Sequence, residues 1–355
     1  MVESQLPSST QPAAPSHESV SGSVAQVLTR AWQHRGVVAW LLLPLSLLYR
    51  GLVALRRGLY AIGWLKQTVL PVPVVVVGNI FVGGTGKTPL VIWLIGQLRA
   101  QGFRPGVISR GYGAALDEAT EVSERSLPAE VGDEPLLIAT KAGVPVVVGR
   151  RRVQAATRLL QWHPDIDVIV SDDGLQHYAL ARQLEIQLSD ARGHGNGWLL
   201  PAGPLREPVS RRSDFYVGNG VLPKRGGYLM RLVGDHAEQI ADRTQRQPLA
   251  AIPADACVVA AAGIGHPQRF FDMLSSHGVR LARTIALPDH FDFSHNPFDG
   301  IEADVILVTD KDAVKCARIE TLAADPRLWA VPVKASIDGP LADHIVEKLR
   351  GHPTA

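Results

Sequence analysis

The segment from Val74 to Pro89 constrains the fold of this chain more than any other part of the sequence. Four consecutive valines, residues 74–77, predict a buried β-strand. Glycines follow at positions 78, 83, 84 and 86, and an apolar helical pattern begins after Pro89. A strand, a glycine-rich turn and a helix bring backbone N–H groups and the positive end of the helix dipole to one point. This arrangement predicts a phosphate-binding loop; the alternative is an ordinary turn between a strand and a helix.

The residues that close this loop favour the phosphate-binding interpretation. We expect Lys87 to reach the β- and γ-phosphates of a nucleotide and the hydroxyl of Thr88 to ligate Mg²⁺. The strict pattern G-x-x-x-x-G-K-[ST] requires glycine where this chain has Phe81. We still expect nucleotide binding, because Gly-Lys-Thr stands between a predicted strand and a predicted helix. The residues predicted to bind the nucleotide are Gly83, Gly84, Thr85, Gly86, Lys87 and Thr88.

The composition allows a large core and argues against several classes of protein. The chain has 355 residues, 46% hydrophobic and 20% charged, which is compatible with two lobes. The formal net charge of +2 does not indicate a nucleic-acid partner, and we expect none. Only Cys257 and Cys316 are present, far apart in the sequence. They argue against a disulfide framework or a zinc site and are consistent with a reducing compartment.

Two N-terminal segments differ sharply in composition. Residues 1–28 are rich in Ser, Pro, Gln and Ala and poor in large apolar groups, so we expect a disordered tail. Residues 29–70 contain an apolar run from Val37 to Tyr49, followed by several arginines. This run is shorter than the roughly 20 uninterrupted apolar residues that a transmembrane helix needs. It also begins too far from the first residue for a signal peptide.

The spacing of polar residues in segment 29–70 predicts an amphipathic helix. Ser46, Arg50 and Arg57 are separated by four and seven residues and share one helical face, while Leu and Trp occupy much of the rest. This pattern suits a helix that lies in a membrane interface with its arginines reaching anionic headgroups. The alternative is a helix that packs on the core of a soluble protein. We expect peripheral association with a membrane.

A second strong signal is segment 166–177, where an apolar strand ends in two aspartates. Adjacent carboxylates such as Asp172 and Asp173 need a cation or hydrogen-bond donors to balance their charge. We expect them to hold Mg²⁺ beside the phosphate loop, directly or through water. The alternative is a surface turn. Gln176 and His177 follow, and they either face the same cleft or begin the next helix.

Other candidate ligand-binding residues lie in loops after predicted strands, where open α/β sheets bind their ligands. Each has a simpler interpretation as a solvated side chain or as a helix-capping acid. These candidates are Arg110 and Tyr112 after strand 106–109, Asp133 and Glu134 before Pro135, the triplet Arg150–Arg152 after strand 145–149, and Arg206 and Glu207 at the end of a proline- and glycine-rich loop.

The pattern of strands and helices predicts an α/β protein with two lobes. We expect a parallel-sheet core over residues 71–213, a β connection over 214–250 and a smaller C-terminal α/β lobe over 251–355. In the second lobe, His290 stands between Asp289 and Phe291. No internal repeat is visible in the sequence.

Taken together, these segments resemble the tetraacyldisaccharide 4′-kinase family, the lipid A 4′-kinases. The resemblance covers roughly residues 30–320 in one order, and the shifted glycines of the phosphate loop belong to the family's own pattern. Two small departures are His266, where asparagine is expected, and Asp310, where glutamate is usual. The resemblance is carried by segments 78–89, 109–113, 132–135, 172–177, 203–207, 288–290 and 309–315.

The resemblance implies a fold, a reaction and a location. The fold is an α/β core like that of P-loop nucleotide triphosphatases, with an N-terminal membrane-associated helix. The reaction is transfer of the γ-phosphate of ATP, with Mg²⁺, to the 4′-hydroxyl of a tetraacylated glucosamine disaccharide 1-phosphate, which gives lipid IVA. The location is the cytoplasmic face of the Gram-negative inner membrane. We expect a peripheral or monotopic monomer.

The resemblance also implies roles for individual residues of this sequence. Asp133 and His290 match a catalytic pair, in which Asp133 is the better candidate for the base and His290 orients it or shares the proton. The residues expected around Mg²⁺ are Thr88, Asp172, Asp173 and Glu207. The expected substrate-binding residues are Arg110, Tyr112, Arg152, Gln176, His177 and Arg206.

Two other classes of function stay open from the sequence. A regulatory ATPase or GTPase uses water as its nucleophile, which leaves the arginine-bearing apolar segment and the Asp–His pair without a task. A GTPase would also carry the guanine-recognition motif Asn-Lys-x-Asp, and residues 309–312 resemble that motif only superficially. A nucleotide-independent membrane scaffold leaves Gly-Lys-Thr and the two aspartates unexplained. An assay with ATP labelled in its γ-phosphate separates the three. Label in lipid indicates a kinase, label in free phosphate indicates a hydrolase, and no release of label favours the scaffold.

Overall fold

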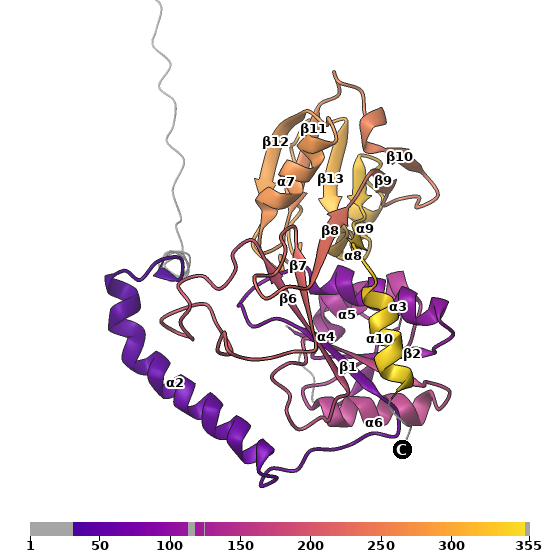
Figure 1. The fold of residues 1–355 in the computed structure, drawn as a ribbon. Coiled ribbons are helices and arrows are strands. Elements are labelled where there is room, and N and C mark those ends of the chain that lie inside the picture. Colours follow the sequence, from indigo (N-terminus) through magenta and orange to yellow (C-terminus); the bar gives the residue numbers. More distant parts are fainter. Residues whose placement is uncertain (1–30, 113–117, 124, 352–355) are drawn as a thin grey trace, which may run out of the picture.

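The computed structural model describes residues 31–112, 118–123 and 125–351, arranged as two α/β lobes with one long helix outside them (Figure 1). In Figure 1 the second lobe lies above the first, and helix α2 (Val37–Ala61) runs along one side of the first lobe. The tail expected over residues 1–28 lies outside the described part of the chain.

The first lobe is built on a nine-stranded sheet in the order β15-β8-β7-β6-β1-β5-β2-β4-β3. The strands from β8 to β4 in this order run parallel, and only the edge strands β15 and β3 pair antiparallel. The predicted parallel α/β core is therefore confirmed. The strands are β1 (Val74–Gly78), β2 (Pro105–Ser109), β3 (Thr120–Glu121), β4 (Val146–Val148), β5 (Val168–Asp172), β6 (Leu184–Asp190), β7 (Phe215–Asn219), β8 (Tyr228–Val233) and β15 (Lys334–Ile337).

Helices cover both faces of this sheet, which explains the unbroken run of valines in β1. Val75 and Val77 pack in one apolar cluster with residues of α3 (Lys87–Ala100), α5 (Asp133–Ala142) and α10 (Leu341–Arg350). Val74 and Val76 pack on the opposite face with residues of α6 (Arg152–Trp162). A strand that is buried on both faces has no polar side to present, so its sequence does not alternate. The short helix α4 (Pro128–Val131) precedes α5.

The second lobe has a six-stranded sheet in the order β10-β9-β14-β13-β11-β12. Its strands β12, β11, β13 and β14 are parallel, and β9 pairs antiparallel with β14 and with β10. Its elements are β9 (His236–Gln239), β10 (Arg246–Pro248), η1 (Leu249–Ala251), β11 (Val258–Ala262), α7 (Pro267–Ser276), β12 (Leu281–Ala286), β13 (Val305–Thr309), α8 (Asp310–Cys316), α9 (Glu320–Ala323) and β14 (Leu328–Val331).

We expected a core, a β connection and a second lobe as three consecutive segments of the chain. The structure differs from this expectation. Residues 214–250 do not form a separate connection, because β7 and β8 extend the first sheet and β9 and β10 belong to the second. Within 251–355, β15 pairs with β8, and α10 packs on the first lobe. Short strand patterns in a sequence do not tell with which sheet each strand pairs, and neighbours in sequence need not be neighbours in a sheet.

Helix α2 has 25 residues and continues beyond the apolar run, through the three arginines that follow it. Among the described residues it is the one helix long and apolar enough to cross a membrane, judged by length and composition alone. Only 11% of its most apolar window is buried. This makes α2 a candidate membrane-associated helix. The large apolar side chains that it exposes are Val37, Val38, Trp40, Leu41, Leu45, Leu47, Leu48, Leu52 and Leu55.

The polar face of α2 turns toward the protein. We had expected its arginines to reach lipid headgroups instead. Ser46 is buried, and its Oγ donates a 2.8 Å hydrogen bond to the carbonyl oxygen of Leu199. The Arg57 guanidinium lies 3.7 Å from a carboxylate oxygen of Glu207. The face that shares these two residues anchors α2 on the loop at 194–211 and leaves the apolar side chains outside.

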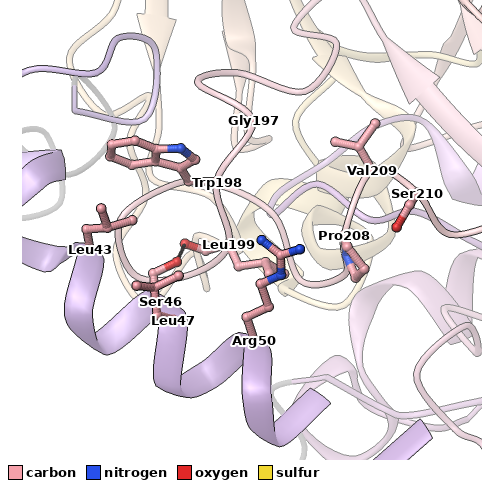
Figure 2. A pocket seen from close by; sticks show the side chains of 10 residues that line it. All are labelled: Leu43, Ser46, Leu47, Arg50, Gly197, Trp198, Leu199, Pro208, Val209 and Ser210. Carbon is pink, nitrogen blue, oxygen red and sulfur yellow. Dashed lines mark hydrogen bonds between the residues drawn. The ribbon is translucent and has the colours of Figure 1, made fainter. Parts of the chain in front are cut away.

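A cavity of about 300 Å³ separates the middle of α2 from this loop (Figure 2). Figure 2 shows the side chain of Arg50 reaching from α2 toward Leu199 and Pro208. The residues that line the cavity are Leu43, Ser46, Leu47 and Arg50 from the helix and Gly197, Trp198, Leu199, Pro208, Val209 and Ser210 from the loop.

Candidate active site

Residues 79–86, which join β1 to α3, contain most of the predicted phosphate loop, and we keep that name for them. Gly86 precedes the helix with a φ of 96°, a left-handed conformation that favours glycine. A Cβ atom there would lie 2.7 Å from the side-chain nitrogen of Asn219. The buried Asn79 amide donates hydrogen bonds to the carbonyl oxygens of Phe81, at 2.7 Å, and Gly83, at 3.3 Å. The Asn79 side chain thus holds the loop in shape, a structural role that we did not predict for it.

Lys87, Asp173 and Arg206 form one charged cluster beside this loop. The Lys87 Nζ lies 3.7 Å from Asp173 Oδ1 and 3.5 Å from the Asn79 Oδ1. Arg206 donates from both terminal nitrogens to the two oxygens of Asp173, at 2.9 and 3.0 Å, and also to the backbone oxygen of Asn79. Burial by itself raises the pKa of Asp173, but the charges of Lys87 and Arg206 hold that pKa below its ordinary value. Asp173 is therefore an ionised residue, paired with two cations.

Asp172 is placed differently, although it is the neighbour of Asp173. It is 1% exposed, and its Oδ2 accepts a 3.0 Å hydrogen bond from the hydroxyl of Ser109. Its Oδ1 is buried and has no hydrogen-bond partner among the described residues. Burial, followed by the nearby charge of Glu134, raises the pKa of Asp172 to about 7. A buried carboxylate oxygen without a donor is well suited to a cation.

The other two residues that we expected around Mg²⁺ have different surroundings. Thr88 lies in the first turn of α3 and is largely buried. Glu207 is 1% exposed, accepts a hydrogen bond from the Tyr178 hydroxyl and lies 3.7 Å from both Arg57 and Arg211. In the described part of the chain, no three His, Cys, Asp or Glu residues are grouped in a way that holds a metal. A magnesium ion here would take only a few protein oxygens and complete its shell with phosphate and water oxygens, which is usual for Mg²⁺.

The predicted pair Asp133 and His290 is brought together across the two lobes. Asp133 is the first residue of α5, and its Oδ2 lies 3.1 Å from Nδ1 of His290, in the loop after β12. Lys315 of α8 donates to the same oxygen at 3.2 Å. Burial by itself raises the pKa of Asp133, but the hydrogen bond with His290 and the charge of Lys315 hold it below the ordinary value. Asp133 is thus ionised and held by two groups of the second lobe.

Contacts of the His290 ring indicate which of its nitrogens carries the proton. The Lys311 Nζ lies 3.3 Å from His290 Nε2 and 3.0 Å from Asp289. An ammonium group only donates, so Nε2 accepts and the ring proton lies on Nδ1. Nδ1–H then donates to Asp133. His290 itself has a φ of 60°, the left-handed region that non-glycine residues seldom adopt.

The six residues expected at the substrate fall into three groups. Arg110 and Tyr112 are exposed, and the Tyr112 ring lies beside the pair, 5.4 Å from that of His290. Gln176 and Arg206 both contact the backbone oxygen of Asn79, at 3.5 and 3.1 Å.

The remaining two expected substrate residues differ in burial: Arg152 is buried and His177 is half-buried. Arg152 is 2% exposed and donates to the carbonyl oxygens of Gly149 and Asp172, so in this structure it supports the strand end from inside. Burial, together with the charges of Arg152 and Arg110, lowers the pKa of His177 to about 4. The His177 imidazole is therefore neutral near pH 7.

Residues to which we gave no role connect the phosphate loop with the second lobe. Asp190 of β6 and the nearby Arg192 belong to the first lobe, and Arg269 and Gly265 to the second. Arg192 donates a 2.7 Å hydrogen bond to the carbonyl oxygen of Gly84, and its guanidinium lies 4.5 Å from the centre of the Phe81 ring. Asp190, which pairs with Arg192 at 2.8 Å, also pairs with Arg269 of α7 at 3.1 Å. A Cβ atom on Gly265 would lie 3.5 Å from the Gly84 nitrogen. The glycine turn after β11 thus lies against the phosphate loop.

Comparison with known proteins agrees with this geometry. The family model described as tetraacyldisaccharide-1-P 4′-kinase matches residues 38–350 of the chain. The tetraacyldisaccharide 4′-kinase of Janthinobacterium sp. (strain Marseille) is 56% identical over 342 residues, covering 94% of this chain and 98% of that protein. The enzyme of the same name from Herminiimonas arsenicoxydans is 53% identical over 352 residues, covering 94% and 98%.

A solved structure is similar over nearly the same length. It is the crystal structure of LpxK from Aquifex aeolicus in complex with ATP, with a TM-score of 0.74 and 31% identity, covering 89% of this chain and 99% of that one. Its similarity includes both lobes of the present chain. From the phosphate loop, the cross-lobe Asp–His pair and these matches, we conclude that the chain belongs to the tetraacyldisaccharide 4′-kinase family.

Proposed function

We propose that this protein transfers the γ-phosphate of ATP to the 4′-hydroxyl of a tetraacylated glucosamine disaccharide 1-phosphate, giving lipid IVA. The observation that carries the proposal is the pair Asp133–His290, which joins the two lobes. Its neighbour Asp289 and Gly84 of the phosphate loop both lie close to Gly265. An enzyme that activates a sugar hydroxyl needs such a proton acceptor. The names of the relatives supply the identity of the substrate.

The phosphate loop and its charged neighbours would hold the nucleotide. Backbone N–H groups of residues 83–88 surround the phosphates at the N-terminus of α3, and Lys87 adds a positive charge. Arg206 keeps Asp173 beside Lys87 through its two hydrogen bonds. Phosphoryl transfer depends mostly on such positioning and on charge neutralisation, with little covalent chemistry by the protein.

Magnesium would lie at the acid-ended strand β5. The unpartnered Oδ1 of Asp172 and the hydroxyl of Thr88 are the best-supported ligands. Before they could contribute, Asp173 would need to release Arg206, and Glu207 would need to release its ion pairs with Arg57 and Arg211. When bound, the ion neutralises charge on the β- and γ-phosphates.

Asp133 is the proposed general base. His290 donates Nδ1–H to Oδ2 of Asp133, which leaves the carboxylate ionised and oriented. The 4′-hydroxyl of the acceptor gives its proton to this carboxylate as the oxygen attacks the γ-phosphorus, the bond between the γ-phosphorus and the β–γ bridging oxygen breaks, and ADP leaves with that oxygen. Tyr112, which lies beside the pair, and Arg110, which is exposed, are proposed to contact the sugar or its phosphate. Gln176 and His177 are proposed to line the same cleft.

The proposed location is the cytoplasmic face of the Gram-negative inner membrane, with the protein present as a monomer. The exposed apolar side of α2 supports membrane association, since burial of exposed apolar area in lipid is favourable. A tetraacylated substrate hardly leaves the bilayer. An enzyme seated on that surface meets its substrate without extracting it.

One assay tests the proposed reaction. The purified protein is incubated in detergent micelles with ATP labelled in the γ-phosphate, Mg²⁺ and the tetraacyldisaccharide 1-phosphate. We expect label in the extracted lipid, and less by a factor of about 10² or more with Asp133→Ala at the same time points. Label released only as free phosphate would identify a hydrolase and refute the proposal.

A further inference from the structure

Lys315 is a buried lysine at the centre of the contact between the lobes. It lies on α8, is 4% exposed, and donates to Asp133 Oδ2 at 3.2 Å. Its Nζ also lies 3.5 Å from Asp312 Oδ1 and 5.5 Å from the centre of the Phe293 ring. Burying an ammonium group is expensive unless carboxylates compensate it. Two carboxylates do so here, one from each lobe.

The side chain of Asp312 is held in place by hydrogen bonds within the second lobe. It is completely buried, and its Oδ2 accepts hydrogen bonds from the backbone N–H of Gly263, at 2.8 Å, and from the Thr309 hydroxyl, at 2.6 Å. Its other oxygen, Oδ1, faces Lys315 and has no hydrogen-bond partner among the described residues. Because Asp312 is held by its own lobe, it fixes where Lys315 presents its charge.

Lys315 and His290 approach the same oxygen of Asp133. Both donors lie on Oδ2, at 3.2 and 3.1 Å, and no hydrogen bond from any described residue reaches Oδ1. The carboxylate is therefore oriented by two groups on one side and leaves its second oxygen for an acceptor hydroxyl. The charged and titratable groups that face Asp133 are His290 from the loop after β12, and Lys311 and Lys315 from α8, with Asp312 behind Lys315.

We propose that Lys315 is a positioning residue for the base: it holds the Asp133 carboxylate ionised and turned toward His290 when α8 packs against α5. This inference rests on the role of Asp133 in the proposed function. It makes assembly of the base dependent on the contact between the lobes, because the two donors to Asp133, His290 and Lys315, both come from the second lobe.

The same two helices supply a matched control. At the other end of α5, Lys141 pairs with Asp310 of α8 at 3.0 Å and with Glu238 of β9 at 3.8 Å. This ion pair joins the same helices with the charges exchanged, and it does not contact Asp133. Loss of Lys141 therefore loosens the interface without removing a donor from the base.

The test compares Lys315→Met, Lys315→Arg and Lys141→Met with the parent protein in detergent micelles. The carboxyl carbon of Asp133 is followed by NMR in protein labelled at aspartate, with the signal assigned by its absence in Asp133→Asn. In Lys315→Met we expect the pKa of Asp133 to rise by about one pH unit or more, because an opposite charge at this distance is removed. The acidic limb of the kcat profile should move to higher pH by the same amount. In Lys315→Arg, the pKa of Asp133 and the acidic limb of the kcat profile should both lie closer to the parent values.

The outcomes separate this inference from the proposed function. An unchanged Asp133 titration in Lys315→Met, or an equal change in Lys141→Met, would overturn the role of Lys315. If Lys315→Met does not fold, the parent protein still decides, because an Asp133 that titrates at or above the ordinary aspartate pKa contradicts the inference. Absence of label in lipid with the parent enzyme would remove the proposed function while leaving the titration result intact.

Discussion

Arg206 holds the carboxylate of Asp173 with two parallel hydrogen bonds, at 2.9 and 3.0 Å, one from each terminal nitrogen of its guanidinium. The same guanidinium donates to the backbone oxygen of Asn79, the residue that shapes the phosphate loop. Arg206 therefore joins the loop to the acid-ended strand, and its planar geometry is part of that function.

Arg206→Lys tests this junction. Lysine keeps the positive charge but replaces two parallel donors by a single point charge. Losing one charged hydrogen bond of ~1.5 kcal/mol corresponds to about a tenfold fall in kcat/KM for ATP. Steady-state kinetics at saturating lipid measure it, and Lys348→Arg, at the exposed ion pair with Asp214, is the control. An unchanged kcat/KM would show that charge alone is sufficient at this position.

Asp133→Ala tests the base. We expect kcat to fall by a factor of about 10² or more, the usual consequence of losing a general base. The KM for ATP should change little, because Asp133 contacts none of the phosphate-loop residues in the described hydrogen-bond network. Turnover near that of the parent protein would exclude Asp133 as the base.

Gly86→Ala tests the backbone of the phosphate loop. Alanine at a φ of 96° is strained, and its Cβ would lie 2.7 Å from the Asn219 side chain. We expect loss of ~1–3 kcal/mol of stability and weaker ATP binding, measured by thermal unfolding and by titration with ATP. Gly96→Ala is the control, because Gly96 lies inside α3 with no atom within 4 Å of an added Cβ. That substitution should be neutral or stabilising by ~0.5–1 kcal/mol; equal effects of the two would argue against the strain.

Leu48→Asp combined with Leu52→Asp tests the outer face of α2. Both leucines are more than half exposed, at 62% and 57%. Each buried leucine contributes ~1.5–3 kcal/mol, so the double variant should reduce binding to vesicles by well over tenfold in a flotation assay. Thermal stability in solution should be unchanged. Leu222→Asp, an equally exposed leucine between β7 and β8, is the control and should still float with the vesicles.

Asp190 gives a pH-dependent prediction. Burial alone raises its pKa, but the hydrogen bond and charge of Arg192, and then Arg269, hold it below the ordinary value. A carboxyl whose folded-state pKa is depressed stabilises the fold above its ordinary pKa and loses that contribution as the pH falls through the folded value. Asp190→Asn should therefore lower stability near pH 7 and flatten its decline below about pH 4. An equal fall in the free energy of unfolding from neutral to acid pH in the two proteins would contradict this.

The sequence predicted the parts of the site that are contiguous along the chain. Four valines, a glycine turn and Gly-Lys-Thr specify a strand, a loop and a helix locally, and residues 74–100 form them. The aspartates after β5 follow the same logic, since a strand that ends in acids puts them at the carboxyl edge of the sheet.

Contacts between distant segments were beyond such reasoning. Lys315 meets Asp133 from 182 positions away, and Arg192 meets Gly84 from 108. Nothing in the local sequence distinguishes these cations from solvated ones. The pair Asp133–His290 was predicted only through the resemblance to the family, because neither residue has a local pattern that points to the other. The direction of Arg57 was wrong for a related reason: a helical face with arginines suits headgroups and a buried Glu207 equally well.

The pairing of β8 with β15 has a consequence for the architecture of the chain. The first lobe is left at Val233 and re-entered at Lys334, and these two residues are partners in adjacent strands. The whole second lobe is thus an insertion into a continuous first domain, at a point where the two ends nearly touch. A short turn from Val233 to Lys334 would close the first domain without the insert, whereas truncation from the C-terminus would remove β15 and α10 and expose the apolar cluster that contains β1. Asp133 therefore belongs to the domain that both ends of the described chain build, and His290 belongs to the domain inserted into it.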